Sequence, residues 1–199
     1  LGRVLTAVAP QEPEAHGLLA LMELNASRTM ARTDAAGEPI LLLDQNRALW
    51  DQLQIRRGLK ALARAAELGG ARGPYGLQAA IVACHATAET AAETDWQRIA
   101  AFYADLAELA RSPVVELNRA IAIAMAEGPA VGLAIVERLG SEPSLQNYHL
   151  LPSVRGDLLE KLGRCEEARA AFEAAAALAG NKRERNLLRR RAEAAWAGT

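Results

Sequence analysis

Residues 154–178 read VRGDLLEKLGRCEEARAAFEAAAAL, and the spacing of their small and apolar residues gives the clearest indication of the fold. In its second half, Ala168, Phe172 and Ala175 follow one another in steps of four and three, which places them on one face of an α-helix. The first half carries Gly156, and Gly163 separates the two halves. The stretch therefore predicts two helices joined by a short turn, and a short turn makes the helices antiparallel.

The same pattern returns earlier in the chain. Segments 18–26, 78–86 and 118–126 align with the start of this stretch, and each copy has a small residue where two helices would cross closely, at Ala20, Ala80, Ala120 and Gly156. The steps of four and three also recur in the second halves, beginning at Gly58, Ile99 and Gly132. Repetition of one helical unit predicts a solenoid, a fold whose extended surface usually binds other macromolecules. The long interval from Ala20 to Ala80 predicts an insertion.

These offsets resemble those of the tetratricopeptide (TPR) repeat, most closely in the last unit. Two positions depart from that pattern: Pro152 stands where a large residue is common, and Gly180 where TPRs often have Pro. The resemblance implies an all-α fold, a TPR-like, right-handed α-α superhelix of antiparallel helix pairs. We expect a single domain over residues 1–199 of about four and a half repeats. It would include a small hairpin insert at about 32–44 and a C-terminal capping helix at about 181–197.

Apolar periodicity predicts the individual helices, at 14–31, 45–68, 76–87, 95–110, 113–127, 130–139, 145–161, 165–178 and 183–197. Before them, Leu1, Leu5 and Val8 fit the second helix of a repeat whose first helix is missing. The sequence also lacks an initiator Met. We therefore expect the chain to be a fragment of a longer protein.

The composition favours helices and argues against several classes of protein. Apolar residues make up 51% of the chain and aromatic residues only 4%, a difference supplied mostly by Ala, the best helix former. The net charge of -1 gives no global sign of a nucleic-acid or membrane partner. Cys84 and Cys165 lack disulfide or zinc spacing, and no apolar run is long enough to span a bilayer. We therefore expect a cytoplasmic protein.

One segment interrupts the helical rhythm. Residues 32–43 contain an Ala-Gly turn signal followed by a branched apolar run at 40–43, which predicts a small hairpin or ordered loop. Asp44 follows this run, and we expect its carboxylate to cap the next helix by accepting backbone N–H bonds. This insert accounts for the long interval between the first two repeats.

A more specific resemblance, to one protein family, depends on several short stretches taken together. They are residues 17–22, 31–32, 44–47, 50–51, 73–75, 77–81, 85, 118–120 and 148–151. Over nearly its whole length the chain resembles the C-terminal extension of a TPR-bearing group of extracytoplasmic-function (ECF) sigma factors. One departure is Asn46, which stands where the family usually has a second Asp. An ion pair at that position would be weakened to a hydrogen bond.

The resemblance implies a bacterial transcription factor whose promoter-binding and polymerase-binding domains lie upstream of this chain. The extension would regulate the sigma factor in place of a dedicated anti-sigma factor. Its implied partners are its own upstream sigma domains, the RNA polymerase core and a YCII-like small protein. No direct nucleic-acid contact and no membrane contact are expected from this part.

A dense polar cluster in and after the insert is the first candidate site: Arg32, Asp34, Asp44, Gln45, Arg47, Trp50 and Asp51. In a structural interpretation, Arg–Asp pairs and a buried Trp pin the insert to the helices. In a functional interpretation, the same groups form the contact patch for the sigma domains, because Arg and Trp are common interface anchors. The two roles are compatible.

A second candidate set would line a groove: Tyr75, Gln78, His85 and Asn118. Gln78 and Asn118 occupy equivalent places in successive first helices, where TPR proteins can hydrogen-bond a bound peptide. The alternative is an inter-repeat hydrogen bond, and Val154 interrupts the series in the next repeat.

The sequence favours a protein-binding function over a catalytic one. His85 stands in an Ala-rich helix with no carboxylate at a helical offset that would clearly polarise it. His16 and His149 lack metal-ligand spacing, and no phosphate-binding loop is present, so we expect no cofactor and no metal. The basic last helix is interpreted as a polar cap, with a patch for an acidic partner as the alternative.

The sequence thus predicts a regulatory, protein-interaction domain of a sigma factor and no enzyme. One alternative is a self-standing TPR adaptor that binds a peptide or partner protein. The other is a hydrolase that uses His85.

Overall fold

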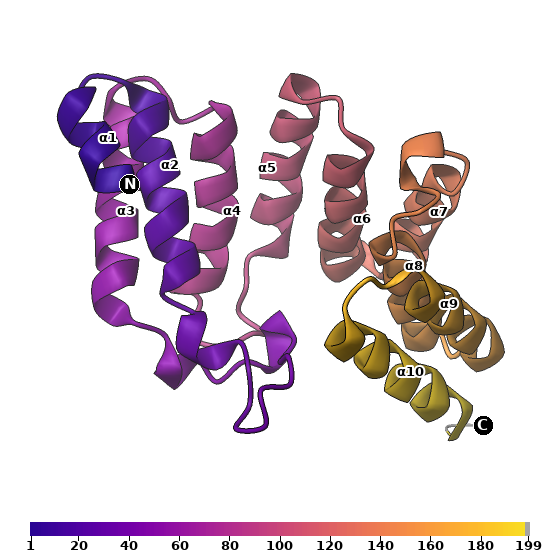
Figure 1. The fold of residues 1–199 in the computed structure, drawn as a ribbon. Coiled ribbons are helices and arrows are strands. Elements are labelled where there is room, and N and C mark those ends of the chain that lie inside the picture. Colours follow the sequence, from indigo (N-terminus) through magenta and orange to yellow (C-terminus); the bar gives the residue numbers. More distant parts are fainter. Residues whose placement is uncertain (198–199) are drawn as a thin grey trace. The chain divides into compact units, whose positions relative to one another are not determined.

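The computed structural model describes residues 1–197, and within them the chain is all-α, as predicted (Figure 1). Ten α-helices are found there, with four short 3-10 turns between them. The α-helices are α1 Gly2–Val8, α2 Pro13–Ala26, α3 Gln52–Glu67, α4 Pro74–Thr87, α5 Trp96–Leu109, α6 Pro113–Glu127, α7 Pro129–Leu139, α8 Leu150–Lys161, α9 Cys165–Leu178 and α10 Lys182–Ala197. The 3-10 turns are η1 Thr29–Ala31, η2 Leu42–Asp44, η3 Arg47–Leu49 and η4 Pro143–Leu145.

The chain divides into two compact units, Leu1–Arg111 and Ser112–Thr199. Each consists of sequential antiparallel helix pairs, which confirms the repeat-like packing predicted from the sequence. The expectation of one continuous repeat domain stays a prediction. None of the described helices is both long and apolar enough to cross a lipid bilayer.

In the first unit, α2 pairs with α3 and α4 pairs with α5, while α2 also packs against α1 and α4. The α2–α3 crossing is close because Gly58 has no side chain. A Cβ there would lie 2.6 Å from Cγ of Leu24, which is fully buried. Leu24 belongs to a core cluster with Ala31, Trp50, Ile55 and Ala83. This core joins the two helix pairs of the unit to the insert.

In the second unit, α6 pairs with α7 and α8 with α9, and α10 covers α9. Ala168, Phe172 and Ala175 are fully buried, so the steps of four and three mark the core face of α9 as predicted. Gly156 of α8 lies against the Phe172 ring, and a Cβ there would meet the ring at 2.7 Å. The small residue at this position therefore sets the distance between α8 and α9.

The last helix packs on the second unit, and two of its arginines bind groups of that unit. Arg191 binds the carboxylates of Asp157 and of Glu160, the latter at 2.6 Å, and its guanidinium lies 4.3 Å from the Phe172 ring centroid. Arg185 donates to the carbonyl of Ala179. These two arginines are used within the fold, which supports the capping interpretation over a patch for an acidic partner.

One predicted crossing residue is wrong by one position. Ala20 and Ala120 are fully buried, whereas Ala80 is only half-buried and the neighbouring Ala79 is fully buried. Ala79 forms a buried cluster with Ala20 and Ala61, because α4 is rotated to turn this face toward α2 and α3. Alignment of the repeats by sequence could not fix this rotation.

The insert contains the predicted hairpin in a minimal form. Thr33 and Pro39 form an isolated antiparallel bridge, and the Ile40 amide donates to the Arg32 carbonyl at 2.8 Å. The Asp34 carboxylate closes the turn by accepting from the amides of Ala36 and Glu38 at 2.9 and 2.8 Å. In Figure 1 the insert lies at the lower ends of α2 and α3.

The helix predicted over 45–68 is wrong in its first part. Trp50 and Asp51 are extended, with ψ values of 128° and 104°, so α3 begins only at Gln52. The expected cap at Asp44 is also wrong. Asp51 caps α3, accepting from the amides of Leu53 and Gln54 at 2.8 and 3.0 Å, since the chain turns into the helix seven residues later than periodicity suggested.

Two other predicted helices are too long at one end. The helix over 14–31 ends at Ala26 and is followed by η1, and the helix over 145–161 begins at Leu150 after η4. In both cases apolar residues of a neighbouring 3-10 turn, Met30 or Leu145, extend the apolar pattern past the α-helix, so spacing alone could not separate the two.

Candidate interaction surface

Arg47 fastens the insert to the C-terminal end of α4. Its Nη1 donates to the backbone carbonyls of His85 and Ala88, the latter at 2.9 Å, and its Nη2 donates to Oγ1 of Thr94 at 3.3 Å. The last carbonyls of a helix have no partner within the helix, and a cation there also meets the negative end of the helix dipole. Arg47 therefore satisfies groups that α4 leaves open.

Trp50 fills the space beneath Arg47. Its side chain is only 3% exposed, and the guanidinium groups of Arg47 and Arg28 lie 4.7 and 5.8 Å from its ring centroid. Such cation–π contacts add to the apolar burial of the indole. Trp50 is thus a core residue of the first unit, as the structural interpretation of the cluster expected.

The other polar residues of the cluster also act inside the insert. Arg32 donates to the Asn25 carbonyl at 3.0 Å, and the Gln45 amide donates to the Ile40 carbonyl at 3.2 Å. Asn46 caps η3 by accepting from the Ala48 amide at 3.0 Å, a role that an Asp could fill equally well.

The expected Arg–Asp pairs within the cluster are wrong. Among the described residues, no ion pair joins Arg32 or Arg47 to Asp34, Asp44 or Asp51. The arginines donate mainly to backbone carbonyls, and Asp34 and Asp51 accept from backbone amides. The cluster therefore orders the backbone of the insert, and the Asp44 side chain is exposed.

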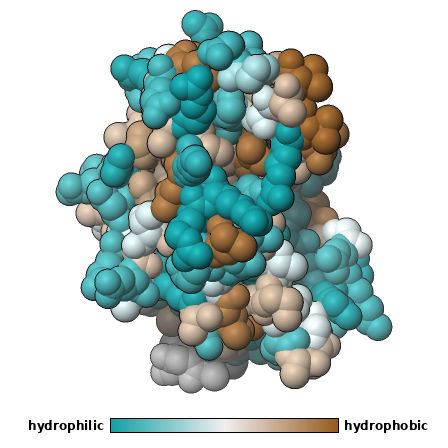
Figure 2. All heavy atoms as spheres, turned by 90° about the vertical axis from the view of Figure 1, so that its left-hand side faces the viewer, coloured by the Kyte–Doolittle hydropathy of each residue, from teal (hydrophilic) through white to brown (hydrophobic). Residues whose placement is uncertain are grey.

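A set of large apolar side chains, in the insert and in the segments just before and after it, is exposed and was not selected from the sequence. We call it the insert surface; it consists of Met30, Leu41, Leu43, Leu49 and Leu53, which are between 38 and 75% exposed. Figure 2 views the molecule from the side of α1–α3, and apolar atoms are exposed among hydrophilic ones at its lower end, where the insert lies. The apolar run at 40–43, in a segment without helical spacing, was the available signal.

His85 lies on the buried side of the same region. It is 7% exposed, packs edge-on against Trp96 with ring centroids 5.1 Å apart, and its Nδ1 has no hydrogen-bond partner among the described residues. Burial, with added repulsion from Arg28 and Arg47, lowers the pKa of His85 to about 4. His85 is therefore neutral near pH 7, and no carboxylate of the residues that the structure describes hydrogen-bonds to its ring.

Tyr75, Gln78 and His85 of the predicted groove lie on α4, and among the described residues no hydrogen bond joins their side chains. The Gln78 amide donates to the Pro74 carbonyl of its own helix at 3.1 Å, and Tyr75 is 41% exposed. Asn118 is half-buried on α6 and belongs to the other compact unit. The part of the chain that the structure describes also holds no group of three side chains able to bind a metal ion.

Comparison with known proteins adds relatives but no activity. A family model described as a family of unknown function (DUF6596) matches residues 1–66, which contain α1, α2, the insert and most of α3. An uncharacterized protein of Rhizobium meliloti (strain 1021) is 46% identical over 189 residues, covering 95% of this chain and 44% of that protein. The chain thus spans less than half the length of this curated relative. No solved structure matches the chain.

Proposed function

We propose that the chain is the regulatory, protein-interaction domain of a bacterial ECF-type sigma factor and acts in the cytoplasm. The sequence resemblance to the C-terminal extension of these proteins motivates the proposal. A relative more than twice as long as the aligned region agrees with a domain that works as part of a larger protein. We propose no catalytic role for the domain.

The observation that supports the proposal is that the insert surface is exposed on a segment held in place by contacts with the rest of the first unit. Arg47 and Trp50 hold the insert against α4 and the core, while Leu43 and Leu49 remain 38 and 52% exposed. Large apolar side chains that stay exposed on an ordered segment are candidates for contact with a partner protein. Because these contacts already order the segment, it would lose little conformational entropy when a partner binds.

In the proposed mechanism, the insert surface contacts the upstream sigma domains or the RNA polymerase core. Contact in one state and release in another would change how readily the sigma domains engage the polymerase, since a switch requires different contacts in its two states. A YCII-like small protein is a further proposed partner, which would compete for the same surface.

The test is promoter output from the complete sigma factor with Leu43→Ser and Leu49→Ser together. Both side chains are exposed, so the fold should persist, whereas changing Arg47 and Trp50 would unfold the insert. We expect transcription from dependent promoters to change about tenfold at equal protein level. The matched control is Leu109→Ser on α5, because Leu109 is 55% exposed and lies outside the insert.

Output equal to wild type from the folded double variant would remove the insert surface from the mechanism. If the complete wild-type protein drives no promoter at all, the sigma-factor proposal fails. The alternative of a TPR adaptor would then be the one to pursue.

A further inference from the structure

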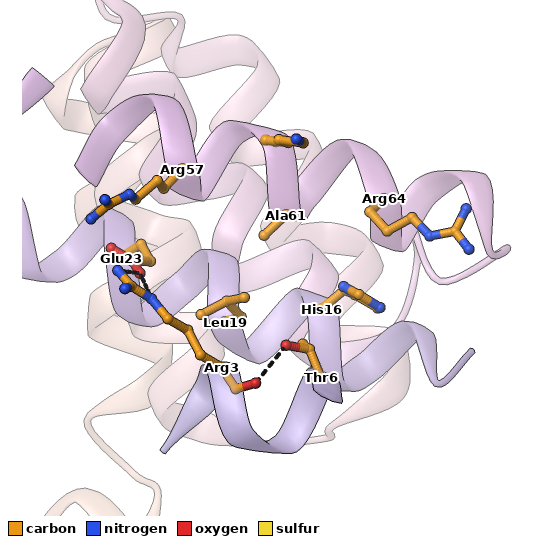
Figure 3. A pocket seen from close by; sticks show the side chains of 9 residues that line it. Arg3, Thr6, His16, Leu19, Glu23, Arg57, Ala61 and Arg64 are labelled. Carbon is orange, nitrogen blue, oxygen red and sulfur yellow. Dashed lines mark hydrogen bonds and ion pairs between the residues drawn. The ribbon is translucent and has the colours of Figure 1, made fainter. Parts of the chain in front are cut away.

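A cavity of about 400 Å³ lies between α1, α2 and α3 in the first unit (Figure 3). α2 and α3 contribute Leu19 and Ala61 to its apolar part, and Arg3 of α1 crosses one side. Its size falls within the range of sites that bind small molecules or short segments of a partner. None of its lining residues belongs to the insert surface.

The cavity carries excess positive charge. Its acidic residue, Glu23, is already neutralised, because Nε and Nη2 of Arg3 donate to the same carboxylate oxygen at 3.0 and 2.7 Å. Arg57, Lys60 and Arg64 of α3 also line the cavity. Arg64 pairs with Glu67 at 3.0 Å, whereas Arg57 and Lys60 have no acidic partner among the described residues.

These cations form a row. Positions 57, 60 and 64 are spaced three and four apart, so they share one face of α3 and extend along it by about 10 Å, at 1.5 Å per residue. A row of this length matches several carboxylates spread along a chain better than one small anion. The apolar part formed by Leu19 and Ala61 lies beside the row and suits an aliphatic side chain.

We propose that this cavity binds a protein segment in which aliphatic residues are flanked by aspartates or glutamates. The aliphatic side chain would lie on Leu19 and Ala61, and its flanking carboxylates would pair with Arg57 and Lys60. The inference does not rest on the proposed regulation of a sigma factor, because it concerns other residues and a different measurement.

The test uses the whole 199-residue chain and a fluorescein-labelled peptide in which two central leucines are flanked by glutamates. Fluorescence anisotropy gives its Kd. Arg57→Glu with Lys60→Glu should weaken binding about tenfold or more, since both changes reverse the charge that attracts the peptide. Arg56→Glu is the matched control, because Arg56 is an exposed neighbour on α3 that does not line the cavity.

Two further measurements distinguish binding to the apolar part of the cavity from attraction by charge alone. Thr6→Phe, at a residue of α1 that lines the cavity, should block the apolar part and also weaken binding. A peptide with the leucines replaced by serines should bind at least about tenfold more weakly. Circular dichroism confirms that each variant keeps its helices.

Three results would overturn the inference: no binding of the leucine peptide, equal loss with Arg56→Glu and with the double reversal, or equal binding of the serine peptide. Either of the last two results would mean that the peptide binds through nonspecific attraction to the positive charge of α3. None of these results bears on promoter output, so failure here leaves the proposed function intact.

Discussion

The guanidinium of Arg47 lies 4.7 Å from the centroid of the Trp50 ring while its Nη1 binds the carbonyls of His85 and Ala88. One side chain therefore joins the insert, the buried indole and the end of α4. The partners on α4 are 38 and 41 residues away in sequence, so the contact also fixes the insert relative to the second helix pair. The stability of the first unit should depend on both residues.

Trp50→Ala should lower the free energy of unfolding by about 3–5 kcal/mol, because it leaves a large cavity in the core and exposes the contact face of Arg47. Urea denaturation followed by circular dichroism measures the change. Leu49→Ala is the control: Leu49 is 52% exposed, so its removal should change stability by no more than about 0.5 kcal/mol. Equal effects of the two variants would contradict the buried position of Trp50.

Arg47→Lys should destabilise the first unit by about 1–3 kcal/mol, even though the charge is kept. An ammonium group cannot reach two carbonyls and a hydroxyl with the fixed geometry of a guanidinium. Arg56→Lys, on the exposed side of α3, serves as the control for the same chemical change. Hydrogen exchange at the end of α4 should speed up only in the Arg47 variant, and unchanged exchange there would argue against the contact.

Gly156→Ala should destabilise the second unit by about 1–3 kcal/mol, because the new methyl group would meet the Phe172 ring at 2.7 Å. Gly180→Ala is a matched control. A Cβ at Gly180 has no atom within 4 Å and its φ is not positive, so the change should be neutral or stabilise by about 0.4–1 kcal/mol. Thermal unfolding distinguishes the two, and a stable Gly156→Ala protein would contradict the close α8–α9 approach.

The stability should fall on acidification because of His85. Its pKa is lowered by burial to about 4 in the fold, against 6.5 in the unfolded chain, so the unfolded chain binds the proton first. The contribution is complete above pH 6.5 and is lost as the pH falls toward 4, by roughly 3 kcal/mol in total.

Urea denaturation at several pH values between 7 and 4.5 measures this loss. His85→Gln should flatten the profile in that range, because the side chain no longer takes up a proton. His16→Gln is the control for the same substitution at a histidine outside the buried cluster. A His85→Gln profile as steep as wild type would mean that other groups cause the acid sensitivity.

The local part of the fold could be predicted from particular residues. The predicted helices at 113–127 and 165–178 coincide with α6 and α9. Pro113 begins α6, the turn at Gly163 precedes α9, and a regular apolar face runs through each helix. The hairpin was predicted from its turn signal and is stabilised by Asp34, whose partners lie within four residues. Interactions between residues that are so close in sequence can be predicted from the sequence pattern.

The candidate site was predicted only in outline. The cluster around Arg47 and Trp50 was selected correctly as a pin for the insert, but the expected Arg–Asp pairs were wrong and the apolar insert surface was missed. The sequence shows which side chains can donate and accept hydrogen bonds, but many donor–acceptor pairs are compatible with the same sequence. Which pairing forms depends on the carbonyls and amides that the ends of α3 and α4 leave open, and their positions are set by the packing of the helices.

The spacing of apolar and small residues along one helix is a local property of the chain, so the helix pairs of this protein could be predicted before their packing was known. Three features depend on the packing and could not be predicted: Trp50 is buried while Leu49 is exposed, α4 turns Ala79 rather than Ala80 toward its neighbours, and Arg57 and Lys60 border a cavity. Each of these depends on how segments distant in sequence pack together, and for Ala79 on how α4 is rotated against α2 and α3. That rotation is fixed by close contacts between residues distant in sequence, such as Gly58 with Leu24 and Arg47 with the end of α4.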